Sequence, residues 1–252
     1  AGAAPVALCS AEAFYAYAAM NKPACWCRPV VKVFFSFFAP YRWLCLHRVL
    51  IAESSPPLGS DRAVLLCANH VSWWDGFLLR AVHHRLAAHM PLYTVMLSAQ
   101  RQRFFWFRWM GALGIDPGNV GSLRRLFRFL HQERKRRPYW LAFFPQGKIR
   151  PSFARPLRFQ PGIRLMVRAV HPGWIIPVAL HLEPLRYPGP TAFVILGRPI
   201  DTTEDPSPEM LEAATQNLLD RLLMWLSEVG EDAEARWPQF VADLVNSISN
   251  AS

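Results

Sequence analysis

The sequence predicts an α/β fold, with a mostly parallel or mixed sheet flanked by helices and preceded by a helical element that associates with a membrane. Beyond residue 61, short apolar runs alternate with longer helical segments, which is typical of α/β domains. Before residue 52, bulky apolar residues are mixed with cations. The chain has 252 residues, of which 52% are hydrophobic and 18% charged, so it can bury a large core.

The first region, residues 1–52, is expected to be helical and to contact a membrane. Between residues 29 and 50 the bulky apolar side chains are interrupted by basic residues and, in the middle, by Pro40. A membrane-spanning helix needs about 20 apolar residues, and the longest piece without a charge, 33–41, is less than half as long. We therefore expect two amphipathic helices, divided at Pro40, that lie in the membrane interface. A helical lid packed on the domain's own core explains this pattern equally well.

The second region, residues 53–252, is expected to begin with a linker, 53–61, that contains two prolines and a glycine. Apolar runs predict strands and longer amphipathic segments predict helices. The expected strands are 63–68, 92–97, 139–144, 174–182 and 192–196, and the expected helices are 73–87, 101–110, 122–137, 161–170, 207–229 and 238–248.

The charge and the cysteines limit the possible partners and compartment. A formal net charge of +10 indicates an acidic partner, which can be nucleic acid, anionic lipid, an acidic carrier protein or a phosphorylated substrate. Five cysteines without regular spacing favour a reducing compartment. No cluster of residues has the spacing of a metal site. Nucleic acid ranks last, because it leaves the motif described next unexplained.

The polar residues Asn69 and His70 follow the apolar strand 63–68, and Asp75 comes five positions after the histidine. On one helix, side chains five apart point roughly 140° away from each other. If His70 instead precedes the helix and Asp75 lies in its first turn, the carboxylate can accept the Nδ1 proton and leave Nε2 as a base. Ser72 and Asp75 also fit a capping box, in which the carboxylate only satisfies amides at the helix start.

Three further stretches stand where strands of this sheet are expected to end or to cross the core. Residues 111–118 form a glycine-rich turn before a helix, where backbone amides can hold an anion. Residues 143–150 contain a Pro-x-Gly turn followed by Lys148 and Arg150; these cations either project over the rim of the sheet or are solvated surface charges. Residues 175–180 are expected to form a core strand, with Pro177 at a strand start or edge.

These stretches, taken in order, resemble the motifs of the glycerolipid acyltransferase family, which includes the 1-acylglycerol-3-phosphate acyltransferases. The motifs are Asn-His-x4-Asp, Gly-x-x-x-Ile-Asp, Phe-Pro-x-Gly and Ile-Pro-Val-Ala. The resemblance runs over about residues 63–199. It implies a membrane-associated O-acyltransferase that takes a fatty acyl group from acyl-CoA or an acyl carrier protein, needs no cofactor, and uses a His-Asp pair as base.

The resemblance also implies the residues of the site. His70 and Asp75 are expected to be catalytic. The substrate-binding residues are expected to be Asn69, Asp116, Arg124, Gln146, Gly147, Lys148 and Arg150. We expect the protein to sit on anionic lipid at the cytoplasmic face of a membrane, as a peripheral or monotopic protein. A non-catalytic module that binds a membrane or an acyl carrier on the same scaffold is the alternative.

The sequence departs from the family at positions that the family links to the phosphate of the acceptor. The third motif usually has glutamate where this chain has Gln146, and the second usually ends in arginine where this chain has Pro117. A glutamine can position a hydroxyl by hydrogen bonding but brings no charge. The acceptor therefore stays open between a lysophosphatidate and a lipid with another headgroup, such as a lyso-aminolipid, a glycolipid or a glycosylated isoprenoid.

Overall fold

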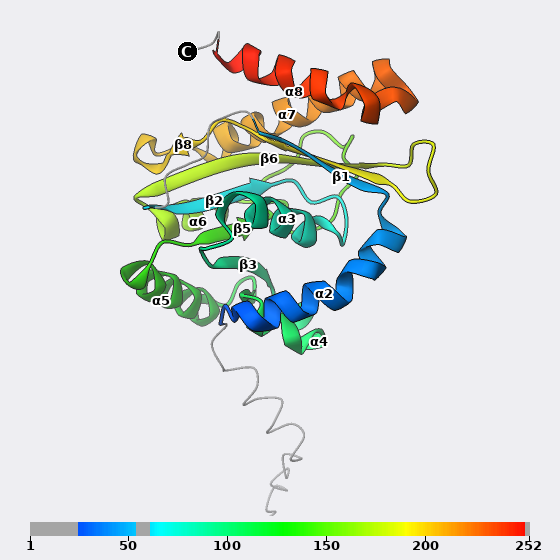
Figure 1. Ribbon diagram of the computed structural model, residues 1–252. Helices are drawn as coiled ribbons and strands as arrows, with labels where there is room; N and C mark the ends of the chain where they lie inside the picture. The colour runs from blue at the N-terminus through cyan, green and yellow to red at the C-terminus, as the bar shows by residue number, and fades with distance from the viewer. Residues whose placement is uncertain (1–24, 54–60, 250–252) are drawn as a thin grey trace, which may run out of the picture.

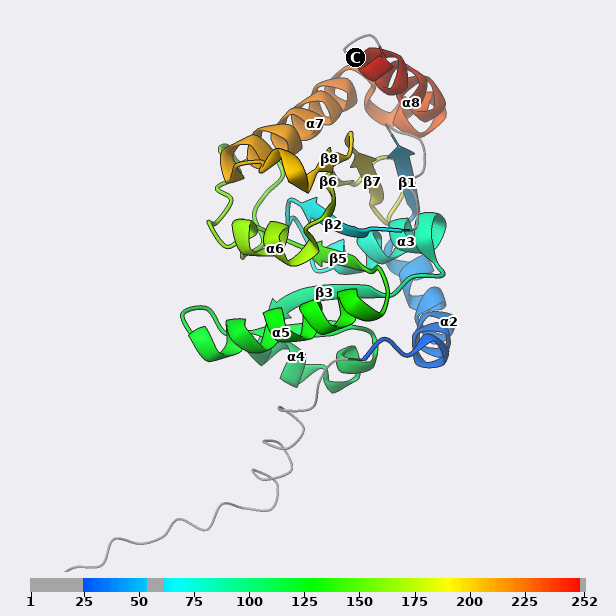
Figure 2. The same cartoon turned by 90° about the vertical axis from the view of Figure 1, so that its left-hand side faces the viewer.

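The computed structural model describes residues 25–53 and 61–249, so most of the expected linker lies outside the described residues. The described residues form an eight-stranded sheet in the order β1-β7-β6-β2-β5-β3-β4, and β8 pairs with β6. Helices lie on both faces of this sheet (Figure 1; Figure 2). The predicted α/β fold with a mixed sheet flanked by helices is therefore confirmed.

The strands follow one another with helices between most of them. Their bounds are Arg48–Glu53 (β1), Ala63–Ala68 (β2), Leu92–Leu97 (β3), Ala112–Ile115 (β4), Trp140–Phe143 (β5), Gly173–Glu183 (β6), Thr191–Leu196 (β7) and Ile200–Asp201 (β8). The helices are Arg28–Cys45 (α2), Asp75–Ala87 (α3), Ser98–Arg103 (α4), Val120–Arg136 (α5), Ile163–Val170 (α6), Pro208–Val229 (α7) and Ala233–Ser249 (α8). A 3₁₀-helix, Phe105–Trp109, follows α4.

The strand directions decide where a site can form. Strands β4, β3, β5, β2 and β6 are parallel neighbours, whereas β7 runs antiparallel to β6. The carboxyl ends of the five parallel strands therefore meet at one edge of the sheet, where open α/β sheets place their ligands. The loops that follow β2 and β5 leave from this edge and contain the Asn-His-x4-Asp and Phe-Pro-x-Gly motifs, and the Gly-x-x-x-Ile-Asp motif ends here, one residue after β4.

The core lies on both faces of β2. Leu65 and Cys67 face a cluster that contains residues of α5, α6, α7 and α8, whereas Val64 and Leu66 face a cluster that contains residues of α3. All six residues of β2 are buried, as expected for a central parallel strand covered on both sides. Cys67 is fully buried in the core, as predicted, and this burial raises the pKa of its thiol.

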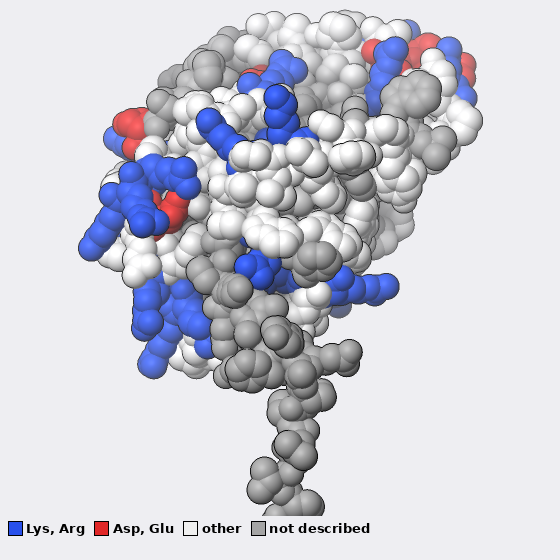
Figure 3. All heavy atoms as spheres, turned by 60° about the horizontal axis from the view of Figure 1, so that its bottom comes forward, with Lys and Arg blue, Asp and Glu red and all other residues white. Residues whose placement is uncertain are grey.

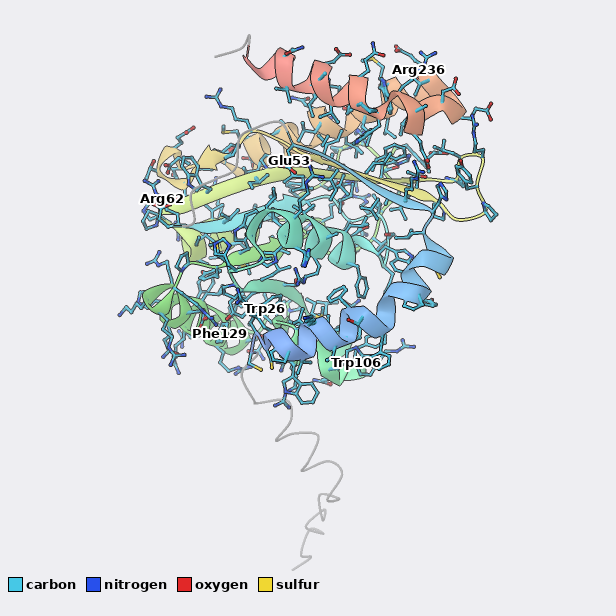
Figure 4. The ribbon with its side chains drawn as sticks, viewed as in Figure 1. Trp26, Glu53, Arg62, Trp106, Phe129 and Arg236 are labelled. Atoms are coloured by element: carbon cyan, nitrogen blue, oxygen red, sulfur yellow. The ribbon has the colours of Figure 1, made fainter. Side chains whose placement is uncertain are left out.

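Side chains fill the space between these layers (Figure 4). On the side of α5 that faces the sheet, Phe129 packs edge-to-face on Tyr93 of β3, with 5.2 Å between ring centroids. Trp26 also lies at the β3 and β4 end of the sheet, where it forms an isolated bridge with Met110. Arg236, on α8, lies at the opposite end of the molecule (Figure 4).

The N-terminal region differs from the predicted pair of helices. One helix, α2, runs through Pro40, and the strand β1 follows it. Proline removes the hydrogen bond to the carbonyl four residues earlier, which here belongs to Ser36; both residues are exposed, so water can satisfy that carbonyl. The predicted boundary between residues 52 and 53 falls inside β1, and the division into two regions stays a prediction.

Two sheet elements were also predicted wrongly. Residues 112–115, expected in a glycine-rich turn, form the edge strand β4 beside β3. Pro177 lies inside the central strand β6, not at a start or an edge. Its carbonyl accepts from the Gly197 amide, so its missing amide proton faces the gap between the end of β7 and the start of β8. A proline is tolerated there because no carbonyl of a neighbouring strand needs its donor.

The helix predicted at 101–110 is divided into α4 and the 3₁₀-helix at 105–109, and α8 begins five residues before the predicted start. In the described part of the chain, no helix has the length and apolar character required to span a bilayer.

Candidate active site

His70 and Asp75 lie together at the carboxyl edge of the sheet. Strand β2 ends at Ala68, His70 follows in the loop, and α3 begins at Asp75. The imidazole Nδ1 lies 2.7 Å from the carboxylate Oδ2. Asp75 is fully buried, while the side chain of His70 is 23% exposed. The arrangement expected from the spacing, with the histidine outside the helix and the carboxylate in its first turn, is present in the structure.

The buried carboxylate of Asp75 accepts three further hydrogen bonds. Oδ2 accepts from the backbone amides of Val71 and Ser72, at 2.6 and 3.0 Å, and Oδ1 accepts from the Ser72 hydroxyl at 2.7 Å. Because an ionised carboxylate is only an acceptor, the imidazole proton lies on Nδ1, and the lone pair of Nε2 is left free. In the neutral form of the ring, this free nitrogen can therefore take a proton.

The capping interpretation of Asp75 is compatible with this arrangement. In a capping box the residue at the third helical position reaches back to the amide of the serine, and Asp75 bonds the Ser72 amide in that way. The Ser72 hydroxyl, however, donates to Asp75 and accepts from the Trp74 amide instead of capping the helix. The same carboxylate thus stabilises the helix start and orients the histidine.

Asn69 is buried and joins two strands. Its side-chain Nδ2 donates to the Leu180 carbonyl at 2.9 Å, and its Oδ1 accepts from the Leu180 amide at 2.7 Å. These two bonds continue the pairing of β2 with β6 by one step beyond Ala68. Both polar groups of the Asn69 side chain are thereby used inside the protein, which places the residue behind the site and away from its surface.

Gln146 is also buried, and its amide connects two loops. The Oε1 atom accepts from the backbone amide of His70 at 2.6 Å, and Nε2 donates to the Leu157 carbonyl at 3.0 Å. The side chain was predicted to contact the substrate. In the structure both ends of its amide bond the protein, so Gln146 fixes the histidine loop to the loop that follows β5.

The loop after β5 adds a second contact to the histidine. The Arg150 amide donates to the His70 carbonyl at 2.8 Å, so the backbone of His70 is held on both sides. Gly147 has a positive φ of 66°, which a residue with a side chain rarely adopts. Lys148 is exposed and Arg150 is half-buried. The loop therefore brings two cations to the edge of the sheet that carries His70.

Asp116 and Arg124 lie farther away. Asp116 follows β4, which is three strands from β2 in the sheet; at about 4.8 Å per strand the separation is on the order of 14 Å. The Asp116 amide donates to the Ser122 hydroxyl, and Asn119 caps α5 through the Ser122 amide. Arg124 is exposed on α5. No contact joins either residue to His70 or Asp75.

Three residues that the sequence analysis did not assign also shape the site. The Phe144 ring stacks on the His70 ring, with 4.5 Å between centroids and 22° between planes. Ser72 bonds the carboxylate, as described above. Glu212 of α7 accepts from the Arg158 and Phe159 amides, each at 2.8 Å, and so anchors the loop after β5. The first two lie inside the motifs, but nothing in the local sequence marks Glu212.

The other histidines of α3 do not form a metal site. His83 is fully buried and contacts the Arg80 guanidinium through Nδ1. Burial, with the nearby Arg80 charge, lowers the pKa of His83 to about 3, so it stays neutral. Within residues 25–53 and 61–249, no three histidine, cysteine, aspartate or glutamate side chains gather closely enough to hold a metal ion.

The bonding of Gln146 predicts that glutamate is a poor replacement. In a Gln146→Glu variant a carboxylate faces the Leu157 carbonyl, because the donor Nε2 is lost. An unpaired buried acceptor costs about 1–3 kcal/mol, so we expect the free energy of unfolding, measured by urea denaturation, to fall by about that amount. Gln160→Glu, an exposed change in the same loop, serves as the control. Equal stability of the two variants would contradict the assigned role of the Gln146 amide.

Comparison with known proteins places these features in a family. The family model described as "Acyltransferase" matches residues 48–181, which is more than half of the chain. The fold is similar to the crystal structure of the 1-acyl-sn-glycerophosphate (LPA) acyltransferase from Thermotoga maritima, with a TM-score of 0.54, 19% sequence identity, and coverage of 79% of this chain and 81% of that one. The matched residues include His70, Asp75 and Gln146. The chain belongs to the acyltransferase family and is an acyltransferase.

Proposed function

We propose that this enzyme transfers a fatty acyl group from an acyl thioester to a hydroxyl of a lysophospholipid or a related lipid, with His70 as the general base. The observation that carries the proposal is the 2.7 Å contact between His70 Nδ1 and the buried carboxylate of Asp75. The membership in the acyltransferase family gives the reaction class, and the likeness to the bacterial 1-acyl-sn-glycerophosphate enzyme supports the acceptor class.

The reaction follows from the orientation of the imidazole. The acceptor hydroxyl lies within hydrogen-bond reach of Nε2, gives up its proton, and its oxygen attacks the thioester carbonyl. Asp75 stabilises the positive charge that forms on His70. When the tetrahedral intermediate collapses, the carbon–sulfur bond breaks and the imidazolium returns the proton to the thiolate. The products are an ester and a free thiol, so this route needs no acyl-enzyme and no cofactor.

The cations at the rim are suited to an acidic substrate. Lys148 and Arg150 follow the turn that is bonded to His70, and within the described residues neither appears in an ion pair. We assign to them the charged headgroup of the acceptor or the phosphates of the donor. The buried Gln146 contributes no charge to this edge of the sheet. Both acyl-CoA and an acyl carrier protein match the net charge of +10.

A membrane surface is the second partner that we propose, at the cytoplasmic face. Val33, Phe37 and Tyr41 recur every four residues on α2 and are 56%, 83% and 52% exposed, so they form one apolar stripe. The helix packs against α3 through Phe35 on Phe77, with 6.1 Å between ring centroids. The stripe is therefore attached to the helix that carries Asp75.

Basic side chains add an electrostatic attraction to anionic lipid. Figure 3 shows Lys and Arg gathered at the left of the molecule, at the end where α5 lies in Figure 1. The last turn of α5 carries Arg134, Lys135 and Arg136. Each basic residue near an anionic surface contributes about 1 kcal/mol to the free energy of membrane binding. This contribution adds to that of the apolar stripe, which is too small to anchor the protein by itself.

The role of His70 is tested by His70→Ala. General base catalysis is worth about 10²–10⁴-fold, so acyl transfer to a lysophospholipid, measured as ester formed from a radiolabelled thioester, is expected to fall by that factor. The His84→Ala variant, which changes an exposed histidine on α3, is expected to keep its activity. Circular dichroism checks that both variants fold. Transfer at the parent rate by folded His70→Ala would exclude this histidine as the base.

The membrane contact is tested by Phe37→Glu. A charge in the middle of the exposed stripe opposes insertion, so sedimentation with anionic phosphatidylglycerol vesicles is expected to show at least a tenfold weaker partition coefficient, or about 1.4 kcal/mol. Met224→Glu on α7 makes the same change at another exposed apolar residue and is expected to bind like the parent. If both variants partition equally, α2 does not face the membrane.

A further inference from the structure

A second group of catalytic residue types lies at the end of β6. The Ser152 hydroxyl is 2.8 Å from Nδ1 of His181, and Nε2 of the same ring is 2.8 Å from the Glu183 carboxylate. Ser152 belongs to the loop between β5 and α6, whereas the other two residues are on β6. A nucleophile bonded to a base that is itself oriented by a carboxylate is the pattern by which serine hydrolases are recognised.

The hydrogen bonds decide which atom carries the proton. The Glu183 carboxylate only accepts, so the proton of the neutral ring lies on Nε2. Nδ1 is then an acceptor, and the Ser152 hydroxyl donates to it. Burial lowers the pKa of His181, although the neighbouring Glu183 acts in the opposite direction. The imidazole is therefore neutral near pH 7, and its free lone pair points at the serine proton.

The serine is held in place by its own loop. The Arg155 guanidinium donates to the Ser152 and Ala154 carbonyls and pairs with Asp220 of α7. Glu212, also on α7, fixes the amides at 158 and 159. Because these contacts hold the loop against α7, the distance from the Ser152 hydroxyl to His181 is fixed in the absence of substrate.

The group of Ser152, His181 and Glu183 is separate from the His70 site, but the loop that carries Ser152 also contacts His70. Leu180 belongs to the cluster on the α3 face of the sheet, so the next side chain on the strand, His181, points to the α7 face. Two residues before Ser152, the Arg150 amide bonds the His70 carbonyl. Ser152 is half-buried, and Phe153 beside it is 77% exposed. An acyl chain at this edge of the sheet thus has an apolar contact next to the hydroxyl.

We propose that Ser152, His181 and Glu183 form a second nucleophilic centre that hydrolyses acyl thioesters. Ser152 Oγ attacks the thioester carbonyl while Nδ1 of His181 takes the hydroxyl proton. The carbon–sulfur bond breaks, and the imidazolium gives its proton to the departing thiolate, which leaves an ester on Ser152. Water, deprotonated by the same nitrogen, then attacks this ester. The fatty acid leaves and Ser152 Oγ regains a proton.

A purely structural role for the three residues makes a different prediction. A hydrogen bond that only fastens the loop to β6 requires a donor and an acceptor but no reactive hydroxyl. In that case the serine never becomes acylated, and removing it affects stability alone. Formation of a covalent adduct on Ser152 therefore separates the two roles.

The test uses the full chain carrying His70→Ala, so that hydrolysis is measured without the proposed transfer base. The probe is the decanoyl thioester of N-acetylcysteamine, which has no nucleotide and no carrier protein, and no acceptor lipid is added. Thiol release is followed with a chromogenic disulfide. Adding Ser152→Ala or His181→Ala is expected to lower the rate by about 10²-fold or more. Ser227→Ala, an exposed serine on α7, is the matched control and is expected to keep the rate.

Mass spectrometry of the acid-quenched protein completes the test. We expect a decanoyl adduct on the peptide that contains Ser152, absent after Ser152→Ala. Ser152→Cys, which keeps a nucleophile in the same place, is expected to trap a thioester adduct even where hydrolysis is slow. A folded His70→Ala chain with no adduct and no hydrolysis above the Ser152→Ala level would overturn the proposal. Because the assay omits the acceptor and His70, its result is independent of whether His70 serves acyl transfer.

Discussion

The buried carboxylate of Asp75 is the interaction on which the site depends. An ionised group with no exposure to water is costly unless its oxygens are fully bonded. Here two backbone amides, a hydroxyl and the His70 ring supply those bonds. They hold the chain between β2 and α3 in one conformation, start the helix at Asp75, and fix the tautomer of the histidine. Helix start and catalytic geometry therefore share one set of contacts.

The backbone of His70 is fixed as firmly as its ring. Its amide donates to Gln146 and its carbonyl accepts from the Arg150 amide, while the ring stacks on Phe144. All three partners come from the loop after β5, which α7 in turn holds through Glu212 and Asp220. A base that is held in position before the substrate binds loses little entropy in the reaction. The same anchored loop carries the Ser152 hydroxyl to His181, so one rigid segment serves both proposed centres.

Much of the fold was predictable where local pattern and burial agree. The apolar runs 63–68 and 92–97 coincide with β2 and β3, because these strands are covered by helices and contain almost only apolar residues. The elements that were missed depend on distant partners. Strand β1 pairs with β7, about 140 residues later. Within the described residues β4 pairs with β3 alone, and Pro177 is tolerated because β7 ends beside it. For the site, the spacing of His70 and Asp75 was sufficient to predict their contact, because the two residues are only five positions apart. The bonds of Asn69 to Leu180 and of Gln146 to His70 join segments that are far apart in the sequence, so the burial of these two side chains was not visible in the motifs.

The central claim is that Asp75 holds the proton of His70 on Nδ1 and leaves Nε2 as the base. Long-range ¹H–¹⁵N correlation spectra of the protein with ¹⁵N-labelled histidine report the protonated nitrogen of each ring directly, and His70→Ala assigns the signals. The neutral form of the His70 ring is predicted to carry its proton on Nδ1 and to have a bare Nε2. A ring protonated on Nε2, with Nδ1 bare, would contradict it.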